Sequence, residues 1–152
     1  MKTMDEMAVA GGPATGDDTP ELLRTGADAL GVHLDRGQCE QFARYYRALA
    51  EWNRRVSLTS ITVWEQVQTR HFLDSLTVAA VLPQELLHGG RVLDVGSGGG
   101  FPGLPLKIAF PDLRVGLLEA TGKKAAFLRE VVGLLGLSSA EVYQGRAEEL
   151  GH

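Results

Sequence analysis

An apolar strand that runs straight into a cluster of glycines stands in the second half of the chain. Residues 91–95 form a short β-branched and apolar run, and glycines are dense from position 96 to position 103. Because glycine has no Cβ, the backbone can turn tightly there, and a ligand can approach free main-chain N–H groups. Three of the glycines fit a G-x-G-x-x-G spacing: Gly98, Gly100 and Gly103. The segment predicts either a small-molecule cradle or a tight turn with a structural role only.

A carboxylate follows the next expected strand. Residues 113–118 read as a second buried strand, and Glu119 comes directly after it, 23 residues beyond Gly96. In a parallel sheet this carboxylate lies beside the glycine turn, where it can accept hydrogen bonds from two ribose hydroxyls. Turn and acid together predict an adenosine-containing ligand. Nicotinamide dinucleotides and S-adenosylmethionine both qualify, and only the former bring a pyrophosphate for a helix N-terminus.

Strand and helix patterns alternate in this part of the chain. The expected strands are residues 91–95, 113–118 and 141–144, and the expected helices are residues 104–110 and 121–136. Strands separated by helices require right-handed crossovers and a parallel sheet. We therefore predict an α/β fold and assign residues 89–152 to a partial Rossmann-like domain with three strands.

Helical patterns fill residues 19–88, which we assign to an N-terminal helical region. A short helix is expected with Thr19 as its N-cap and Pro20 at its first position, and Asp35 with Gln38 predicts a capping box at the start of a second helix. The second helix carries a stripe at spacings of three and four, interpreted as core rather than as a base-stacking surface: Phe42, Tyr45, Leu49, Trp52 and Val56. A further helix is predicted over residues 63–82.

Composition is that of an ordinary soluble globular protein, with 44% apolar and 22% charged residues. No uncharged apolar stretch reaches the roughly 20 residues that a membrane helix needs, and acidic residues interrupt any secretory signal at the start of the chain. We therefore expect a cytoplasmic protein. Residues 1–18 have no period and are predicted to be a disordered tail. Cys39 is expected to pack in the core, and the scattered His33, His88 and His152 predict no metal site.

Charge is unevenly distributed along the chain. Residues 36–71 carry six arginines against three glutamates, whereas the whole chain has a net charge of -4. A local basic face is enough for an RNA partner, because affinity depends on the phosphates that the protein contacts. Two interpretations stay open: a non-catalytic RNA-binding or assembly module that uses these helices, and an ordinary solvated helix face.

Several short segments carry a resemblance to a known family. In order they are Glu51-Trp52-Asn53, Ser57-Leu58-Thr59, Arg70-His71-Phe72-Leu73-Asp74-Ser75, Asp94-Val95-Gly96-Ser97-Gly98, Phe101-Pro102-Gly103, Lys123-Lys124 and Arg146-Ala147-Glu148. In this combination, from about residue 22 to residue 149, the chain resembles the small-subunit ribosomal RNA guanine-N7 methyltransferases, also called glucose-inhibited division protein B. The resemblance implies N-terminal helices followed by the first half of a class I (Rossmann-like) methyltransferase parallel sheet.

The resemblance also implies a ligand and a substrate. The cofactor would be S-adenosylmethionine, and the substrate would be guanine N7 in 16S ribosomal RNA, modified by a protein that is a monomer at full length. The implied cofactor-binding residues are Gly96, Gly98, Phe101, Glu119, Ala147 and Glu148. Phe101 and Gly96 would line the methionine end, Glu119 would hold the ribose, and Ala147 with Glu148 would border the adenine.

Two positions keep alternative interpretations, and no catalytic residue is assigned. Arg70 and His71 are candidates for contacts to RNA, or else partners of Asp74 and of helix carbonyls. Members of the family continue through a fourth strand and three more, whereas this sequence stops at His152. It would be either a fragment or a naturally shortened protein. We expect one edge of the central strand to be unpaired and apolar, and we expect no measurable methyl transfer by this polypeptide.

Overall fold

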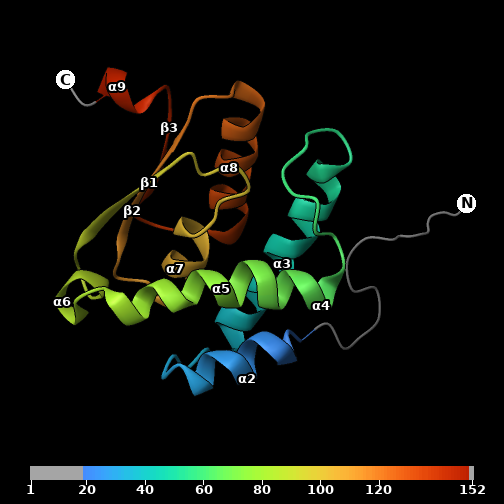
Figure 1. The fold of residues 1–152 in the computed structure, drawn as a ribbon, viewed down its shortest axis with the longest axis vertical. Coiled ribbons are helices and arrows are strands. Elements are labelled where there is room, and N and C mark those ends of the chain that lie inside the picture. Colours follow the sequence, from blue (N-terminus) through green and yellow to red (C-terminus); the bar gives the residue numbers. More distant parts are fainter. Residues whose placement is uncertain (1–18, 151–152) are drawn as a thin grey trace, which may run out of the picture.

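The computed structural model describes residues 19–150, in which a helical first half packs against a three-stranded sheet (Figure 1). The first half contains α2 (Glu21–Ala29), α3 (Arg36–Asn53), α4 (Trp64–Gln66), the π-helix η1 (Val67–Leu73), α5 (Asp74–Leu76), the 3-10 helix η2 (Thr77–Val81) and α6 (Gln84–Leu87). The second half contains β1 (Arg91–Val95), α7 (Gly103–Ala109), β2 (Arg114–Glu119), α8 (Gly122–Leu135), β3 (Ala140–Gln144) and α9 (Ala147–Leu150). The tail expected for residues 1–18, and His152, lie outside the described residues.

The sheet is parallel, with the strand order β1-β2-β3. Val95 at the end of β1 lies opposite Leu118, and Glu119 at the end of β2 lies opposite Gln144. The predicted alternation of strands and helices, and the α/β fold class, are therefore confirmed. All three strands end at the same edge of the sheet, so the segments that follow them lie near one another.

Helix α3 begins with the predicted capping box. Asp35 Oδ1 accepts a hydrogen bond from the Gln38 N–H at 2.8 Å, and Gln38 Oε1 accepts one from the Asp35 N–H at 2.7 Å. These two bonds satisfy N–H groups that the first helical turn leaves without a partner. Four members of the predicted stripe pack from α3 into the core: Phe42, Tyr45 and Leu49 are buried, and Trp52 is half-buried. The fifth, Val56, lies beyond the end of α3 at Asn53.

The single helix predicted over residues 63–82 is instead a succession of α, π and 3-10 turns. A π-turn widens the helix by about one residue. This widening lets the consecutive residues His71 and Phe72 both face Phe101, with ring centroids at 4.3 and 6.1 Å. In a regular α-helix, neighbouring side chains point about 100° apart. The π-turn therefore lies where two consecutive side chains reach Phe101.

One face of the sheet is covered and the other is open. Helices α7 and α8 cover one face, and α3 packs against both of them (Figure 1). Leu93, Val95 and Tyr143 lie on the other face with exposed fractions of 55%, 57% and 42%. Among the described residues β1 pairs with β2 alone, so the unpaired edge lies on β1, an outer strand of this sheet, and not on its central strand. None of the helices in residues 19–150 has the length and apolar character needed to cross a membrane.

Candidate functional site

The glycine turn between β1 and α7 adopts a backbone that few other residues can reach. Gly96, Gly98 and Gly100 have φ angles of 74°, 55° and 101°. A Cβ on Gly100 would lie 2.5 Å from the Tyr45 hydroxyl oxygen, and a Cβ on Gly103 would lie 2.8 Å from Asp94 Oδ2. Glycine is therefore required at 100 and 103 by crowding, and at 96 and 98 by the backbone angle.

Backbone and side-chain hydrogen bonds hold the turn over the end of β2. The N–H groups of Gly96 and Ser97 donate to the Leu118 carbonyl at 2.8 and 3.2 Å. Asp94 Oδ2 accepts the Gly103 N–H at 2.9 Å, which links the end of β1 to the start of α7. Burial raises the pKa of Asp94, against the lowering effect of its bonds to Gly103 and Ser97. The carboxylate thus fixes both ends of the turn.

Glu119 lies in direct contact with the glycine turn. Its Oε1 accepts the Gly98 N–H at 2.8 Å, its Oε2 accepts the Thr121 N–H at 2.9 Å, and the side chain is buried. Burial raises the pKa of Glu119, but the hydrogen bonds from Thr121 and Gly98 and the charge of Lys124 together outweigh burial, so the net shift is downward. The carboxylate is therefore ionised at neutral pH and lies where a parallel sheet was expected to bring it.

The glycine turn faces open space beside this contact. A Cβ on Gly96 would meet nothing within 4 Å, and a Cβ on Gly98 would meet only the Gly96 carbonyl oxygen at 4.0 Å. Each Glu119 oxygen accepts one N–H, and the Thr121 side chain also hydrogen-bonds the carboxylate. A carboxylate has about four lone-pair sites, so one is left for a hydroxyl donor. A separate hollow of about 500 Å³ lies on the open face of the sheet, and it is lined by other residues, Leu93 and Tyr143 among them.

Phe101 closes the turn against the helical half of the protein. Its ring stacks on His71, with centroids 4.3 Å apart and planes 11° apart, and it lies 5.8 Å from the ring of Tyr45. The fully buried Tyr45 donates its hydroxyl to the Gly99 carbonyl at 2.6 Å. Sequence reasoning placed Tyr45 in the core and missed this contact, because the stripe pattern does not distinguish a core tyrosine from one that holds a loop.

Arg70 and His71 are neighbours in η1 but have different surroundings. Arg70 is exposed. His71 is half-buried, and its Nε2 lies 2.6 Å from Thr59 Oγ1. Burial lowers the pKa of His71, and nearby Asp74 opposes the shift. The structure therefore brings His71, but not Arg70, into contact with Phe101 and the glycine turn.

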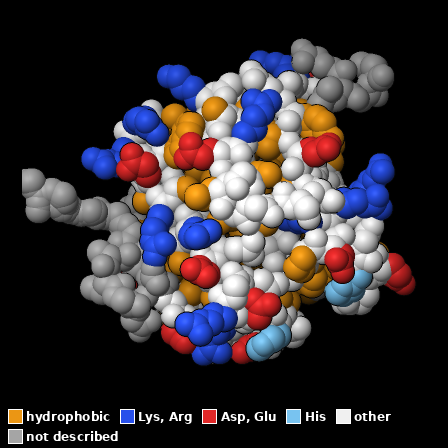
Figure 2. Space-filling view, turned by 180° about the vertical axis from the view of Figure 1, so that it is seen from behind, with side chains coloured by type: hydrophobic (Ala, Val, Ile, Leu, Met, Phe, Trp, Pro, Cys, Tyr) orange, Lys and Arg blue, Asp and Glu red, His pale blue; other side chains and the backbone are white. Residues whose placement is uncertain are grey.

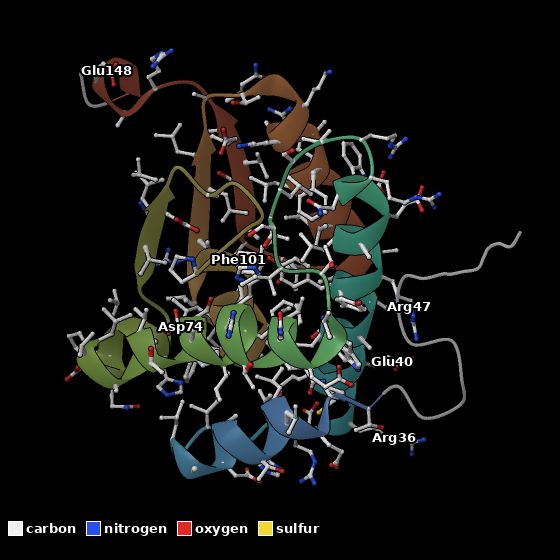
Figure 3. All side chains as sticks on the ribbon, turned by 45° about the vertical axis from the view of Figure 1, so that its right-hand side comes forward. Arg36, Glu40, Arg47, Asp74, Phe101 and Glu148 are labelled. Carbon is white, nitrogen blue, oxygen red and sulfur yellow. The ribbon has the colours of Figure 1, made fainter. Side chains whose placement is uncertain are left out.

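Ala147 and Glu148 lie in α9, after the end of β3, and both are exposed. The Gly145 N–H donates to the Glu119 carbonyl at 3.0 Å, so the chain leaves β3 beside Glu119. Figure 3 shows Glu148 in α9, well apart from Phe101. The segment after β3 shares the sheet edge with Glu119, while its two predicted residues face solvent.

Comparisons with known proteins identify relatives of this chain. A family model described as rRNA small subunit methyltransferase G matches residues 38–152. Proteins named ribosomal RNA small subunit methyltransferase G are similar: that of Roseiflexus castenholzii is 52% identical over 86% of this chain and 54% of its own length, and that of Dehalococcoides mccartyi (strain CBDB1) is 51% identical over 82% and 52%. The chain thus spans about half the length of the curated relatives it matches. It belongs to the rRNA small subunit methyltransferase G family.

Proposed function

We propose that this chain forms the cofactor-binding part of a methyltransferase that uses S-adenosylmethionine to modify guanine N7 in 16S ribosomal RNA. The observation that supports this most is the contact between Glu119 Oε1 and the Gly98 N–H, which joins a carboxylate suited to hold a ribose to the glycine turn at one edge of the sheet. The names of the relatives support a ribosomal RNA substrate. The cytoplasm, where ribosomal RNA is found, is the proposed location.

The proposed roles follow the order of the chain. Gly96 and Gly98, which face open space, allow the methionine end of the cofactor to approach the main chain, with Phe101 beside it. Glu119 accepts a hydrogen bond from a ribose hydroxyl through its remaining lone-pair site. Ala147 and Glu148 border the adenine from the segment after β3. The exposure of these last two residues leaves their side chains accessible to a ligand.

The chemistry needs alignment more than it needs a protein acid or base. S-adenosylmethionine supplies an electrophilic methyl group on a sulfonium, so a C–N bond forms to guanine N7 as the C–S bond breaks. N7 offers a lone pair and carries no proton to remove. Holding two reactants in line lowers the barrier by as much as ~7–11 kcal/mol. The task of the glycine turn and Glu119 is therefore to bind and orient.

Ligand-induced thermal stabilisation tests the cofactor proposal. We expect S-adenosylmethionine and its demethylated product to raise the Tm of the 152-residue chain, since a ligand that binds only the folded state stabilises it. Glu119→Ala should abolish the shift, and Glu85→Ala, at an exposed position in α6, should keep it. No shift at millimolar ligand would contradict the proposal. A shift with a nicotinamide dinucleotide instead would point to an oxidoreductase.

An RNA-binding or assembly module without catalysis is the second candidate. All six arginines of residues 36–71 are exposed, which favours contact with a polyanion. Figure 2 shows basic side chains interspersed with acidic ones on the face seen from behind, so binding would use local clusters and not one continuous patch. This candidate requires RNA binding that weakens with salt and is independent of S-adenosylmethionine. Binding that does not change with salt would exclude it.

A further inference from the structure

The connection between α3 and α4 is folded by its own polar side chains. Asn53 Oδ1 accepts the N–H groups of Leu58 and Thr59 at 2.8 and 2.9 Å. Thr59 Oγ1 in turn accepts the Ile61 N–H at 3.0 Å. These bonds fix the Thr59 hydroxyl in space although it lies in a segment without regular secondary structure.

The Thr59 hydroxyl meets a ring in the next helical stretch. Thr59 Oγ1 and His71 Nε2 lie 2.6 Å apart, across twelve positions of sequence. A hydrogen bond of this length restricts rotation of the imidazole in either tautomer. On its other side, the Ser75 hydroxyl donates to the His71 carbonyl at 2.6 Å, so backbone and ring are both held.

The oriented imidazole then supports the glycine turn through Phe101. The two rings are nearly parallel, at 11°, with centroids 4.3 Å apart. The Phe101 ring lies close over Gly99, because a Cβ built on Gly99 would stand 2.9 Å from Phe101 Cε2. The contacts run without a gap from Thr59 through His71 and Phe101 to the glycine turn.

We propose that Thr59 and His71 are positioning residues that hold Phe101 over Gly99 and so keep the glycine turn in its cofactor-accepting conformation. A turn with three glycines at positive φ has many alternative conformations, and ordering it before binding reduces the entropy that a ligand must overcome. The link between this conformation and cofactor binding rests on the proposed function. The ordering of the turn is a property of the free chain and is testable by itself.

Hydrogen exchange of the free 152-residue chain, followed by mass spectrometry, measures the order of the turn directly. Thr59→Val removes the hydroxyl at nearly constant volume, and we expect exchange of the amides of Ser97 to Phe101 to rise about tenfold. The Ile61 amide also loses its acceptor and should exchange faster, while peptides outside these two segments keep their rates. Thr59→Ser restores a hydroxyl and should restore protection. Thr69→Val, at an exposed threonine of η1, is the matched control and should leave the turn unchanged.

His71→Phe distinguishes the effect of the hydrogen bond to Thr59 from the effect of ring packing on Phe101. It retains a ring for Phe101 and leaves the bond between Thr59 and the Ile61 N–H in place, so only the contact with Thr59 is lost. If the two residues act as a unit, adding Thr59→Val to His71→Phe should produce no further rise in exchange at the turn. Additive effects of the two substitutions would overturn the proposal, as would an unchanged turn in Thr59→Val.

Calorimetric titration with S-adenosylhomocysteine completes the test. We expect the Kd to increase about tenfold in Thr59→Val and to return to the wild-type value in Thr59→Ser. If Thr59→Val shows the expected rise in exchange but the wild-type chain binds no S-adenosylhomocysteine, the proposed function is refuted and the positioning role of Thr59 and His71 is retained. A Kd that is unaffected by a loosened turn would refute the cofactor-accepting part of the inference.

Discussion

The hydroxyl of Tyr45, in the middle of α3, donates a 2.6 Å hydrogen bond to the carbonyl of Gly99 in the glycine turn. The two residues are 54 positions apart, and Tyr45 is fully buried. A helix of the N-terminal half therefore contributes directly to the shape of the candidate site. Burial, with a smaller contribution from Asp94, raises the pKa of Tyr45 well above its usual range, so the hydroxyl stays protonated and able to donate.

Tyr45→Phe should destabilise the protein and loosen the glycine turn. The substitution leaves the Gly99 carbonyl buried without this donor, which costs about 1–3 kcal/mol in the free energy of unfolding. Urea denaturation measures that loss, and hydrogen exchange locates it. Tyr46→Phe is the matched control, because the Tyr46 hydroxyl donates to the Thr62 carbonyl, away from the turn. Equal exchange at residues 96–101 in both variants would contradict this role for Tyr45.

Two glycine-to-alanine substitutions should change stability in opposite directions. At Gly100 the φ of 101° and a Cβ position 2.5 Å from the Tyr45 hydroxyl combine, and we expect a loss of at least about 2 kcal/mol. At Gly133, inside α8, a Cβ would meet nothing within 4 Å, and alanine should add about 0.5–1 kcal/mol through helix propensity. Chemical denaturation of both variants gives the comparison. A stable Gly100→Ala variant would show that the turn is not confined as described.

Much of this arrangement follows from local sequence patterns. The three strands were predicted to within a residue or two, because apolar runs bounded by glycine or polar residues are local signals. The position of Glu119 beside the turn follows from parallel topology. Short α6 was not predicted, and the apolar Leu134 of α8 is 48% exposed. A four-residue helix has almost no periodicity, and a helix pattern does not specify how wide its covered face is.

The sequence did not predict the polar contacts between residues far apart in the chain. Nothing near Thr59 indicates a hydrogen bond to His71, and nothing near Tyr45 indicates Gly99 as its acceptor. The π-turn that turns both His71 and Phe72 toward Phe101 has no local sequence signal that distinguishes it from an α-turn. Such contacts depend on how the two halves dock, so they emerge only with the tertiary structure.

His71 should make the protein less stable as the pH falls below neutrality. Its folded pKa lies below the ordinary 6.5, chiefly because of burial. As the pH falls, His71 therefore binds a proton in the unfolded chain before it does so in the folded chain. The contribution of His71 to stability is complete above pH 6.5 and declines as the pH falls toward the pKa of the folded state. His71→Phe has no imidazole to titrate at this position, so only the wild type loses this stability as the pH falls. Its advantage in unfolding free energy over His71→Phe should therefore become smaller over this interval. Asp74, which opposes the shift, is present in both proteins. A pH-independent difference would show that His71 titrates normally.

The open face of the sheet should drive weak self-association of the chain. Parallel sheets are usually covered on both faces, whereas Leu93 and Val95 are 55% and 57% exposed beside the unpaired edge of β1. Leu93→Glu places a carboxylate in the hollow that Arg91 and Arg114 also line, so it should reduce association with little effect on Tm. Leu22→Glu, at a 47% exposed position in α2, controls for added charge. Sedimentation velocity over a concentration series compares the two. If both variants sediment like the wild type, the open face does not mediate self-association.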